Sequence, residues 1–503
     1  MKSSINNIKE PLTHIVNLSL SMGVVPNEMK VAKVIPIFKT GDRMLFNNYR
    51  PISMLPVFSK ILEKIMAKKI MTFLENSNQL YQHQYGFRTG HTTIHPMIHL
   101  LNKVAQENDK VTKNITMTVF ADLSKAFDTI SHHILLKKLD HMGIRGVANS
   151  WFASYLSNRT QYMDMYTLKS QFEIVQCGVP QGSILGPILF LIYINDIHNS
   201  TPLNVLCFAD DTTISYSSSN VQNLYDTMNQ ELDNMNEWFR ANKLCLNVSK
   251  TKYIIFKPSV RPRNNYHQSL KIDNQTIERI GNDMTTKSYK FLGIHIDETI
   301  SWKDHIKKIC NKISRANYIM NKVKNTIPKT CLLILYQSIV QCHINYGLEL
   351  WGASAVADRV YKLQKRSIRI ANKKSYRYHT EPLFKQCQIL KIKDQYKVNV
   401  AIMMHKLKNG NLPASFEDLD YFSTPERSTR QTDLARHKRA RTQFSALLPY
   451  HTFPNIWNEI EAHNRNTINK NKFKRDLQKN ILQKYQEHIV CINSRCQQCF
   501  PPE

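Results

Sequence analysis

Three aspartates stand next to short apolar segments of this chain, in positions where carboxylates can do chemistry. Asp210 and Asp211 form an adjacent pair, and Asp122 lies far upstream, after another apolar segment. Carboxylates are hard oxygen ligands, and Mg²⁺ is usually held by one or two of them together with waters and substrate phosphates. The three aspartates therefore predict a magnesium site, with Asp122 and Asp210 as bridging ligands and Asp211 as a weaker third.

Two magnesium ions at such a site suit nucleotidyl transfer, because this reaction brings a triphosphate, a hydroxyl nucleophile and a pyrophosphate leaving group together. In a two-metal site, one ion activates the hydroxyl and the other stabilises the leaving group. An adjacent pair of aspartates is also a common polar turn between two strands, without any chemical role. The pair alone does not decide between a metal site and a turn.

Separate predicted strands must bring these carboxylates together. The segments 203–208 and 212–216 predict the two strands of a β-hairpin, with Asp210 and Asp211 at its turn. The alternating segment 115–120 predicts another strand, which ends just before Asp122. If these strands share one sheet, the three carboxylates meet at one edge of it.

A glycine-containing block, Gly178-Val179-Pro180-Gln181-Gly182-Ser183-Ile184-Leu185-Gly186-Pro187, makes the sequence recognisable. The chain closely resembles the reverse transcriptases of non-LTR (LINE-type) retrotransposons, particularly the jockey-like and CR1-like groups. Eight blocks occur between residues 24 and 297 in the order typical of that family, and a less specific resemblance continues beyond them. The blocks are Ile35 to Lys39, Asn48 to Ser53, Tyr85 to Arg88, Phe120 to Asp128, Pro180 to Gly182, Phe208 to Asp211, Ser249 to Lys252 and Phe291 to Ile294.

The resemblance implies a mixed α/β fold with an α+β palm, arranged as a right-hand polymerase with fingers, palm and thumb. We expect fingers in residues 1–110, a palm with the catalytic carboxylates in 111–256, and the end of the palm with the thumb in 257–326. Residues 327–503 are expected to form a mainly helical, basic C-terminal region with a cysteine-containing tail.

The resemblance also assigns residues to a nucleotide pocket. Phe127 matches an aromatic that acts as a steric gate against a ribose 2′-hydroxyl, with an ordinary core position as the alternative. Gln181 matches a nucleotide-pocket glutamine, and Gly182 allows close approach of the backbone. Lys39 and Arg50 match cations that hold the triphosphate, for which arginine offers a bidentate contact and lysine a point charge. For both cations, a solvated surface position is the alternative.

Further roles come from the same resemblance. Lys252 matches a catalytic lysine near the leaving group, where a cation can assist departure of pyrophosphate. Lys250 lies close enough in sequence to be confused with it. Leu123 is expected to offer its backbone carbonyl as an additional metal ligand. Arg88 is expected to contact the nucleic-acid template or the triphosphate.

The composition independently favours a polyanionic partner. The chain has 68 Lys and Arg against 39 Asp and Glu, a net charge of +29 and a pI of about 9.6, a balance that ribosomal and chromatin proteins share. Apolar residues from Trp302 to Val323 follow a helical period with basic residues around them. We expect this helix to lie along a template–primer backbone, with a solvated surface helix as the alternative. Its nucleic-acid-binding candidates are Lys303, Lys307, Lys308, Lys312 and Arg315.

Two more basic segments, 362–377 and 427–441, suggest further RNA contacts, and the second also resembles a nuclear localisation patch. The chain is therefore expected to be an RNA-directed DNA polymerase that uses template RNA, primer DNA, dNTPs and two Mg²⁺ ions. One alternative is a catalytically inactive nucleic-acid-binding remnant of a retrotransposon. The other is a non-mobile cellular reverse transcriptase of the group II intron maturase or telomerase type. The oligomeric state is left open.

The ends and the cysteines complete the expectations. Autonomous elements of the resembled family usually place an endonuclease upstream of the polymerase. Only residues 1 to about 24 precede the fingers region in this sequence, so the chain is expected to lack an endonuclease. Cys207, Cys310 and Cys331 stand in apolar surroundings that predict buried, reduced thiols. The sequence has no signal peptide and no long apolar run. We therefore expect an intracellular protein, nuclear or cytoplasmic, without membrane contact.

The tail has enough ligands for a tetrahedral Zn²⁺, with unstructured reduced cysteines as the alternative. The zinc candidates are His488, Cys491, Cys496 and Cys499.

Overall fold

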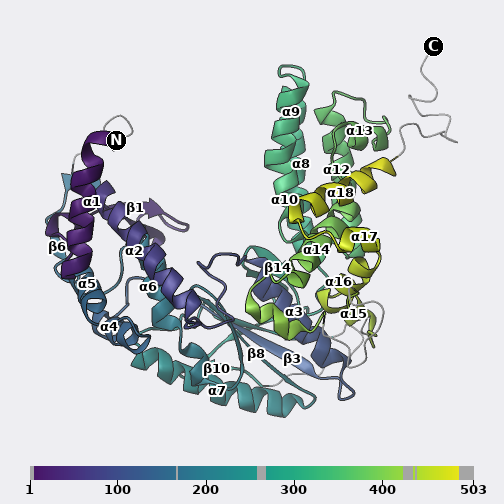
Figure 1. Ribbon diagram of the computed structural model, residues 1–503. Helices are drawn as coiled ribbons and strands as arrows, with labels where there is room; N and C mark the ends of the chain where they lie inside the picture. The colour runs from purple at the N-terminus through teal and green to yellow at the C-terminus, as the bar shows by residue number, and fades with distance from the viewer. Residues whose placement is uncertain (1–4, 166–167, 258–267, 423–433, 437–438, 486–503) are drawn as a thin grey trace.

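The computed structural model describes residues 5–165, 168–257, 268–422, 434–436 and 439–485. Two lobes lie on opposite sides of a central sheet, one lobe N-terminal and one helical and C-terminal (Figure 1). The predicted mixed α/β class and the mainly helical C-terminal region are both confirmed.

The central sheet has five strands in the order β12-β9-β3-β8-β7. β3 pairs antiparallel with both β8 and β9, which makes it the middle strand. The predicted strand at 115–120 and the predicted hairpin at 203–216 are therefore observed. The strands are β3 (Ile115–Ala121), β7 (Asn204–Phe208), β8 (Asp211–Ser218), β9 (Lys252–Phe256) and β12 (Glu278–Ile280).

Both faces of this sheet are buried, so its strands carry apolar residues at alternate positions facing two different cores. Successive side chains of a strand point to opposite faces. Met117 and Val119 of β3 join a core with α6 (Leu185–Ile194) and α7 (Val221–Ala241), whereas Phe120 joins the core of the C-terminal lobe. A slip of one residue would exchange these faces, so burial fixes the register of the strands.

The N-terminal lobe is built around a second sheet with the order β2-β1-β4-β5, in which β6 also pairs with β4. β4 lies parallel to β1 although it comes from beyond residue 110. This lobe therefore includes segments that the sequence-based division placed in the palm. Its strands are β1 (Val31–Phe38), β2 (Tyr49–Met54), β4 (Thr160–Met165), β5 (Leu168–Lys169) and β6 (Glu173–Ile174), and its helices are α1 (Ile5–Met22), α2 (Val57–Asn76), α4 (His132–His141) and α5 (Val147–Leu156).

The C-terminal lobe begins with short strands and continues as helices. Helix α3 (Ile94–Asp109) connects it to the central sheet, because it contacts β3, α15 and α16. The short strands of this lobe are β13 (Tyr289–Phe291) and β14 (Ile294–Ile296), whereas β10 (Lys271–Ile272) and β11 (Gln275–Thr276) form a separate pair in which β10 packs against α7. The helices are α8 (Lys303–Val323), α9 (Lys329–Tyr336), α10 (Cys342–Asn345), α11 (Leu348–Trp351), α12 (Asp358–Ala371), α13 (Glu381–Gln386), α14 (Ile392–Lys408), α15 (Gln443–Ala446), α16 (Pro449–Asn458), α17 (Ala462–Arg465) and α18 (Lys470–Gln483).

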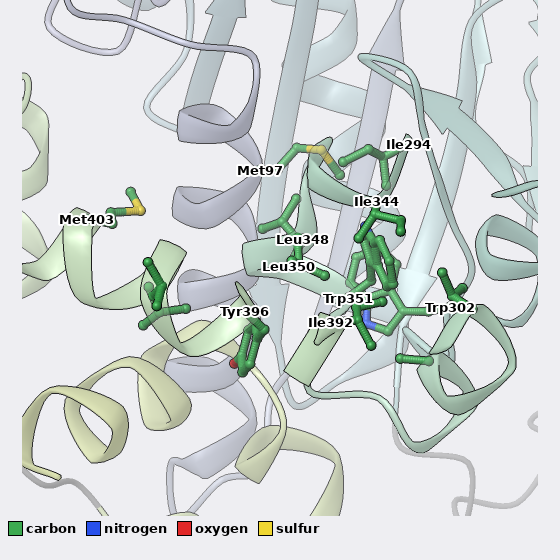
Figure 2. Packing of buried hydrophobic residues seen from close by; sticks show 14 of the residues in the cluster. Met97, Ile294, Trp302, Ile344, Leu348, Leu350, Trp351, Ile392, Tyr396 and Met403 are labelled. Atoms are coloured by element: carbon green, nitrogen blue, oxygen red, sulfur yellow. The ribbon is translucent and has the colours of Figure 1, made fainter. Parts of the chain in front are cut away.

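One apolar core holds this lobe against α3 (Figure 2). Trp302 precedes α8, Trp351 ends α11, and both are buried beside Ile294 of β14. Met97 of α3 joins the same core. Large aromatic side chains contribute much of the buried area in such cores, so the C-terminal lobe and the sheet stabilise each other.

The cysteines differ from the expectation in one respect. Cys207 is buried and Cys310 is partly buried, but Cys331 on α9 is exposed, so the predicted burial is wrong for Cys331. It lies on the outward face of an amphipathic helix whose neighbour Leu332 is buried. The cysteines within the described residues are all free thiols.

A buried carboxylate connects three helices of the N-terminal lobe. Glu63 of α2 accepts a hydrogen bond of 2.7 Å from the Tyr155 hydroxyl of α5, and another of 2.7 Å from the backbone N–H of Ile184. Ile184 immediately precedes α6, where a carboxylate favours the positive end of the helix dipole. Burial raises the pKa of Glu63, because the charged form loses hydration.

We expect Glu63→Ala to lower the free energy of unfolding by about 2–4 kcal/mol, because it leaves the buried Tyr155 hydroxyl and the partly buried N–H of Ile184 without their acceptor. Lys64→Ala, at an exposed position next to it on α2, is the matched control and should change stability little. Urea denaturation followed by circular dichroism measures both. Equal stability of the two variants would show that Glu63 does not connect these helices.

Candidate active site

The three aspartates lie at one end of the central sheet. Phe208 of β7 pairs with Asp211 of β8, so residues 209 and 210 form the tight turn of a hairpin. Ala121 pairs with Thr212, which places Asp122, the next residue after β3, beside Asp211. The meeting that the sequence predicted is therefore observed. We call this hairpin turn with Asp122 the aspartate site.

Electrostatics in the aspartate site are those of a crowded acidic cluster. Burial, followed by the charges of Asp210 and Asp122, raises the pKa of Asp211 to about 6. Burial is also the main cause that raises the pKa of Asp210, and the charge of Asp122 adds to it. Like charges close together disfavour ionisation of the carboxylates, whereas a nearby cation favours it. A bound cation would therefore stabilise the ionised form of this cluster.

The carboxylate of Asp122 offers a second indication of a cation site. Its Oδ2 is buried and accepts no hydrogen bond, and Lys250 Nζ lies 3.5 Å from it. A buried carboxylate oxygen without a hydrogen bond is costly unless a cation compensates it. The donor set therefore fits a hard divalent cation such as Mg²⁺.

The aspartates do not form a closed cage of protein ligands. Among the residues that the structure describes, no three His, Cys, Asp or Glu side chains form a group that could hold a metal ion by themselves. Mg²⁺ usually keeps waters and binds substrate phosphates alongside one or two carboxylates. The site is thus arranged for an ion that a phosphate substrate also coordinates. The predicted contribution of the Leu123 carbonyl stays a prediction, since Leu123 is placed only by a bridge to Leu246.

Gln181 and Gly182, two of the residues predicted for the nucleotide pocket, lie on one loop. Gln181 Nε2 donates a hydrogen bond of 2.9 Å to Asp128 Oδ1, and the Gln181 carbonyl accepts one of 2.7 Å from the backbone N–H of Ser53 in β2. Gly182 has a φ of +112°, and a Cβ there would lie 2.8 Å from the Ser53 carbonyl oxygen. Only glycine fits this close approach. The loop is therefore held between the N-terminal sheet and the segment that follows Asp122.

Phe127 lies beside this loop. Its carbonyl accepts a hydrogen bond of 2.8 Å from the backbone N–H of Val179. Its partly buried ring packs against Phe190 of α6, with ring centroids 4.9 Å apart. The ring is therefore fixed in orientation, which a gate residue requires; its role as a gate stays a prediction.

Lys39 and Arg50 lie on the N-terminal lobe and are exposed. Lys39 follows β1, and Arg50 pairs with Ile37 in the register of β1 and β2. Their positive charges act on Asp210 and partly offset the rise in its pKa. The structure thus brings both cations within electrostatic reach of Asp210, and their role in holding a triphosphate stays a prediction.

Lys252, the predicted catalytic lysine, and Lys250 have different partners. Lys252 Nζ forms a 2.7 Å ion pair with Glu278 of the neighbouring strand β12 and a 2.7 Å hydrogen bond to the Ser249 carbonyl. Lys250 is the lysine beside Asp122. The structure therefore favours Lys250 for a role close to the aspartates, and Lys252 would have to leave Glu278 to act as a catalytic lysine.

Arg88 is occupied by contacts within the protein. Its guanidinium forms two hydrogen bonds to the Glu75 carboxylate, of 3.0 and 2.7 Å, and donates to the carbonyls of Tyr81 and Gln84. Such bidentate pairs fix geometry. Only 10% of the Arg88 side chain is exposed. This placement gives Arg88 a structural role, and its predicted contact with template or triphosphate stays a prediction.

The predicted basic helix is observed as α8. Lys303, Lys307, Lys308, Lys312 and Arg315 are exposed, whereas Ile306, Ile309 and Ile313 are buried. Lys308 Nζ lies 2.9 Å from a ring nitrogen of His295. An exposed basic stripe of this kind suits contacts with a phosphate backbone, and its role stays a prediction. The zinc candidates His488, Cys491, Cys496 and Cys499 all lie outside the described residues.

Gln84 is a residue that the sequence reasoning missed. Its side chain is almost fully buried, and Oε1 accepts hydrogen bonds from the backbone N–H groups of Ala209 (3.0 Å) and Gly86 (2.8 Å). Ala209 has a φ of +58°, which a residue with a Cβ rarely adopts. Gly86 is tight against Ala209, since a Cβ on Gly86 would lie 2.4 Å from the Ala209 nitrogen. Gln84 therefore holds the strained turn that carries Asp210.

The C-terminal lobe contacts Tyr85, the residue that follows Gln84. Tyr85 donates its backbone N–H to the Cys207 carbonyl of β7, at 2.8 Å, and its buried hydroxyl to Ser415 Oγ, at 3.2 Å. The rings of His95 and His99 pack edge-on against Phe416. Burial lowers the pKa of both histidines to about 3, so this contact stays neutral near physiological pH. The signal for it was the Tyr85-Gly86 block, which sequence alone cannot connect to residue 415.

No helix among the described residues is long and apolar enough to cross a bilayer.

Comparison with known proteins shows which family the chain belongs to. Residues 37–296, more than half of the chain, match the family model described as reverse transcriptase (RNA-dependent DNA polymerase). The chain is 25% identical over 405 residues to the RNA-directed DNA polymerase from mobile element jockey of Drosophila melanogaster, covering 78% of this chain and 43% of that protein. It is 27% identical over 376 residues to the probable RNA-directed DNA polymerase from transposon BS of the same organism, covering 71% of this chain and 40% of that protein. The chain thus spans less than half the length of these relatives.

Among solved structures, the chain is similar to apo telomerase from Candida tropicalis, with a TM-score of 0.42 and 11% identity over 78% of this chain and 67% of that one. It is also similar to telomerase from Candida albicans in complex with a fragment of telomeric RNA, with a TM-score of 0.39 and 10% identity over 75% of this chain and 63% of that one.

Gln84→Ala should weaken binding of Mn²⁺, a probe for Mg²⁺, by about 10- to 100-fold, because outer-shell partners of this kind hold metal ligands in place. Titration followed by electron paramagnetic resonance measures the free and bound ion. Gln82→Ala is the matched control, since Gln82 is exposed two positions away. Equal affinities of the two variants would contradict the positioning role of Gln84.

Asp211→Asn should stabilise the protein in the absence of divalent ions while it weakens Mn²⁺ binding. The pKa of Asp211 in the folded state, about 6, lies above its ordinary value, so the ionised carboxylate destabilises the fold at higher pH. The gain in Tm should be largest above about pH 7 and should shrink as the pH falls from 6 towards 4, where wild-type Asp211 is itself protonated.

Thermal melts in a chelator across this pH range test the prediction for Asp211. Asp233→Asn, at an exposed position on α7, is the control and should show no such pH-dependent gain. A Tm of Asp211→Asn below that of wild type near neutral pH would contradict the proposed repulsion.

Proposed function

Because the chain belongs to the reverse transcriptase (RNA-dependent DNA polymerase) family, we propose that it is an RNA-directed DNA polymerase of the non-LTR retrotransposon type. It extends a DNA primer on an RNA template, using dNTPs. The observation that carries this proposal is the aspartate site, in which strands from distant parts of the sequence bring three aspartates to one end of the central sheet. The fingers, palm and thumb correspond in this proposal to the N-terminal lobe, the central sheet and the helices from α8 onward.

Asp122 and Asp210 hold the divalent ions in this proposal, with Asp211 as the third carboxylate. Reverse transcriptases generally use divalent metal ions, and two Mg²⁺ ions bound here would supply a polarised primer hydroxyl and neutralisation of the leaving phosphates. The acidic cluster supports this assignment through its raised pKa values. Gln84 keeps the turn in place before any substrate binds.

The remaining residues of the site act on the nucleotide. Lys39 and Arg50 approach the aspartates from the N-terminal lobe, where they bind the triphosphate. Gln181, oriented by Asp128, and Phe127 face the sugar and base of the incoming dNTP. In the reaction the primer 3′-hydroxyl oxygen forms a bond to the α-phosphorus, and the bond from that phosphorus to the bridging oxygen of pyrophosphate breaks. Lys250 is placed to stabilise charge beside Asp122.

The basic stripe of α8 binds the template–primer backbone in this proposal. Each phosphate that a lysine or arginine neutralises adds affinity that falls with salt and does not depend on sequence. The exposed cations from Lys303 to Arg315 lie on a single face of α8, which suits a contact along a helical backbone.

Primer extension on an RNA template with purified protein and Mg²⁺ tests the proposal. Wild type should synthesise template-dependent DNA, and Asp210→Ala should lose at least about 100-fold in rate, since a metal ligand is removed. Asp233→Ala, an exposed aspartate of α7, should retain the activity.

Absence of synthesis by well-folded wild type, with salt-sensitive RNA binding retained, would contradict the polymerase proposal. That result would favour the inactive nucleic-acid-binding remnant.

A further inference from the structure

A second basic surface lies on the C-terminal lobe, apart from the stripe on α8. It consists of the outward side of α12 and the turn that follows it, and we call it the Tyr376 surface. Lys362 and Arg366 are exposed one and two turns along α12, and residues 373–377 of the turn are all exposed. Five of its cations are exposed, namely Lys362, Arg366, Lys373, Lys374 and Arg377, and Lys365 and Arg369 are partly buried.

Tyrosines alternate with the cations on this surface. Lys365 Nζ lies 4.9 Å from the ring centroid of Tyr361, and Lys374 Nζ lies 4.9 Å from that of Tyr378. The Arg369 guanidinium lies 5.8 Å from the Tyr376 ring, which is 80% exposed. Cation–π contacts of this kind orient aromatic rings and cations together. An exposed tyrosine ring surrounded by cations offers a flat face to a ligand.

Few carboxylates balance the cations of the Tyr376 surface among the residues that the structure describes. Within the part of the chain that the structure describes, Lys362, Arg366 and Arg377 form no ion pair with a carboxylate. Nearby acids are engaged elsewhere, since Glu381 pairs with Lys391 at 2.6 Å and Asp358 with Lys393 at 3.0 Å. The surface therefore carries an excess of positive charge, so a polyanion would gain affinity by neutralising it.

The position of α12 separates this surface from the α8 stripe. The buried face of α12, including Val360 and Ile368, packs in the same core as the buried face of α8. The exposed faces of the two helices therefore point away from each other. α12 lies on the side of α8 that is turned away from the N-terminal lobe (Figure 1). A duplex between the lobes would contact α8 and leave the Tyr376 surface free.

We propose that the Tyr376 surface binds single-stranded RNA outside the site of the template–primer duplex. The proposal rests on the proposed function, because it assigns the surface to the unpaired part of the same RNA. Unpaired bases can stack on an exposed aromatic ring while lysines and arginines hold their phosphates. Bases inside a duplex are already stacked on one another, so a duplex would use the charges but not the Tyr376 ring.

Fluorescence anisotropy with a short unstructured RNA tests the proposal on the full chain. The RNA is added to protein already saturated with a blunt template–primer hairpin, which occupies the duplex site. Tyr376→Ala should weaken RNA binding by about 5- to 100-fold, corresponding to loss of one base stack. Tyr376→Phe should restore wild-type affinity, because the ring is kept.

Tyr318→Ala provides the matched control, because Tyr318 is an exposed tyrosine of α8 that also carries a lysine, Lys322, 5.6 Å from its ring centroid. It should leave RNA affinity unchanged in this assay. Wild-type RNA affinity in Tyr376→Ala would overturn the proposal. An equal loss of affinity for RNA duplex in Tyr376→Ala would also overturn it, because stacking on unpaired bases would not explain that loss.

Extension of the blunt hairpin separates this inference from the proposed function. Tyr376→Ala should extend it at the wild-type rate. If wild type fails to extend any substrate, the polymerase proposal fails, and the anisotropy result still decides the role of the Tyr376 surface.

Discussion

The antiparallel register of β3 and β8 is the constraint on which the aspartate site depends. It pairs Ala121 with Thr212, and so fixes where Asp122 lies relative to Asp211. Carboxylates in this proximity repel each other, as the raised pKa of Asp211 reflects. The opposing contribution is burial of apolar side chains on both faces of β3, which holds the register because a slip would exchange the faces. The sheet thus supplies the stability that keeps an unfavourable cluster of charges together, a common arrangement at functional sites.

The turn itself needs support that the sheet does not provide. Ala209 adopts a positive φ, and Gln84 holds its N–H from a loop that lies outside the sheet. Tyr85 in turn contacts Ser415 of the C-terminal lobe. The C-terminal lobe is therefore connected to the aspartate site through two hydrogen bonds, one made by Gln84 and one by its neighbour Tyr85. Both hydrogen bonds of this route are made by uncharged side chains, and burial keeps the nearby His95 and His99 neutral, so the route transmits position rather than charge.

Sequence reasoning succeeded where a feature depends on neighbouring residues. The hairpin at Asp210, the strand before Asp122 and the basic helix α8 all follow local periodicity. It does not reach contacts whose partners are distant in the sequence. Nothing local indicates that Arg88 is held by Glu75, that Lys252 pairs with Glu278, or that β4 joins the sheet of β1. Gln84 was missed for the same reason, because a glutamine becomes a positioning residue only when tertiary structure brings Ala209 to it.

Localised cleavage by Fe²⁺ is the most direct test of the central claim, that Asp122, Asp210 and Asp211 together bind a divalent ion. Fe²⁺ substitutes for Mg²⁺, and with ascorbate and peroxide it produces hydroxyl radicals that cut the backbone next to the ion. Mass spectrometry of the fragments locates the cuts. The account predicts cuts near residues 122 and 210 in the same wild-type sample, competed by Mg²⁺ and lost in Asp210→Ala. Cuts confined to other segments, or cuts near 210 without any near 122, would contradict it.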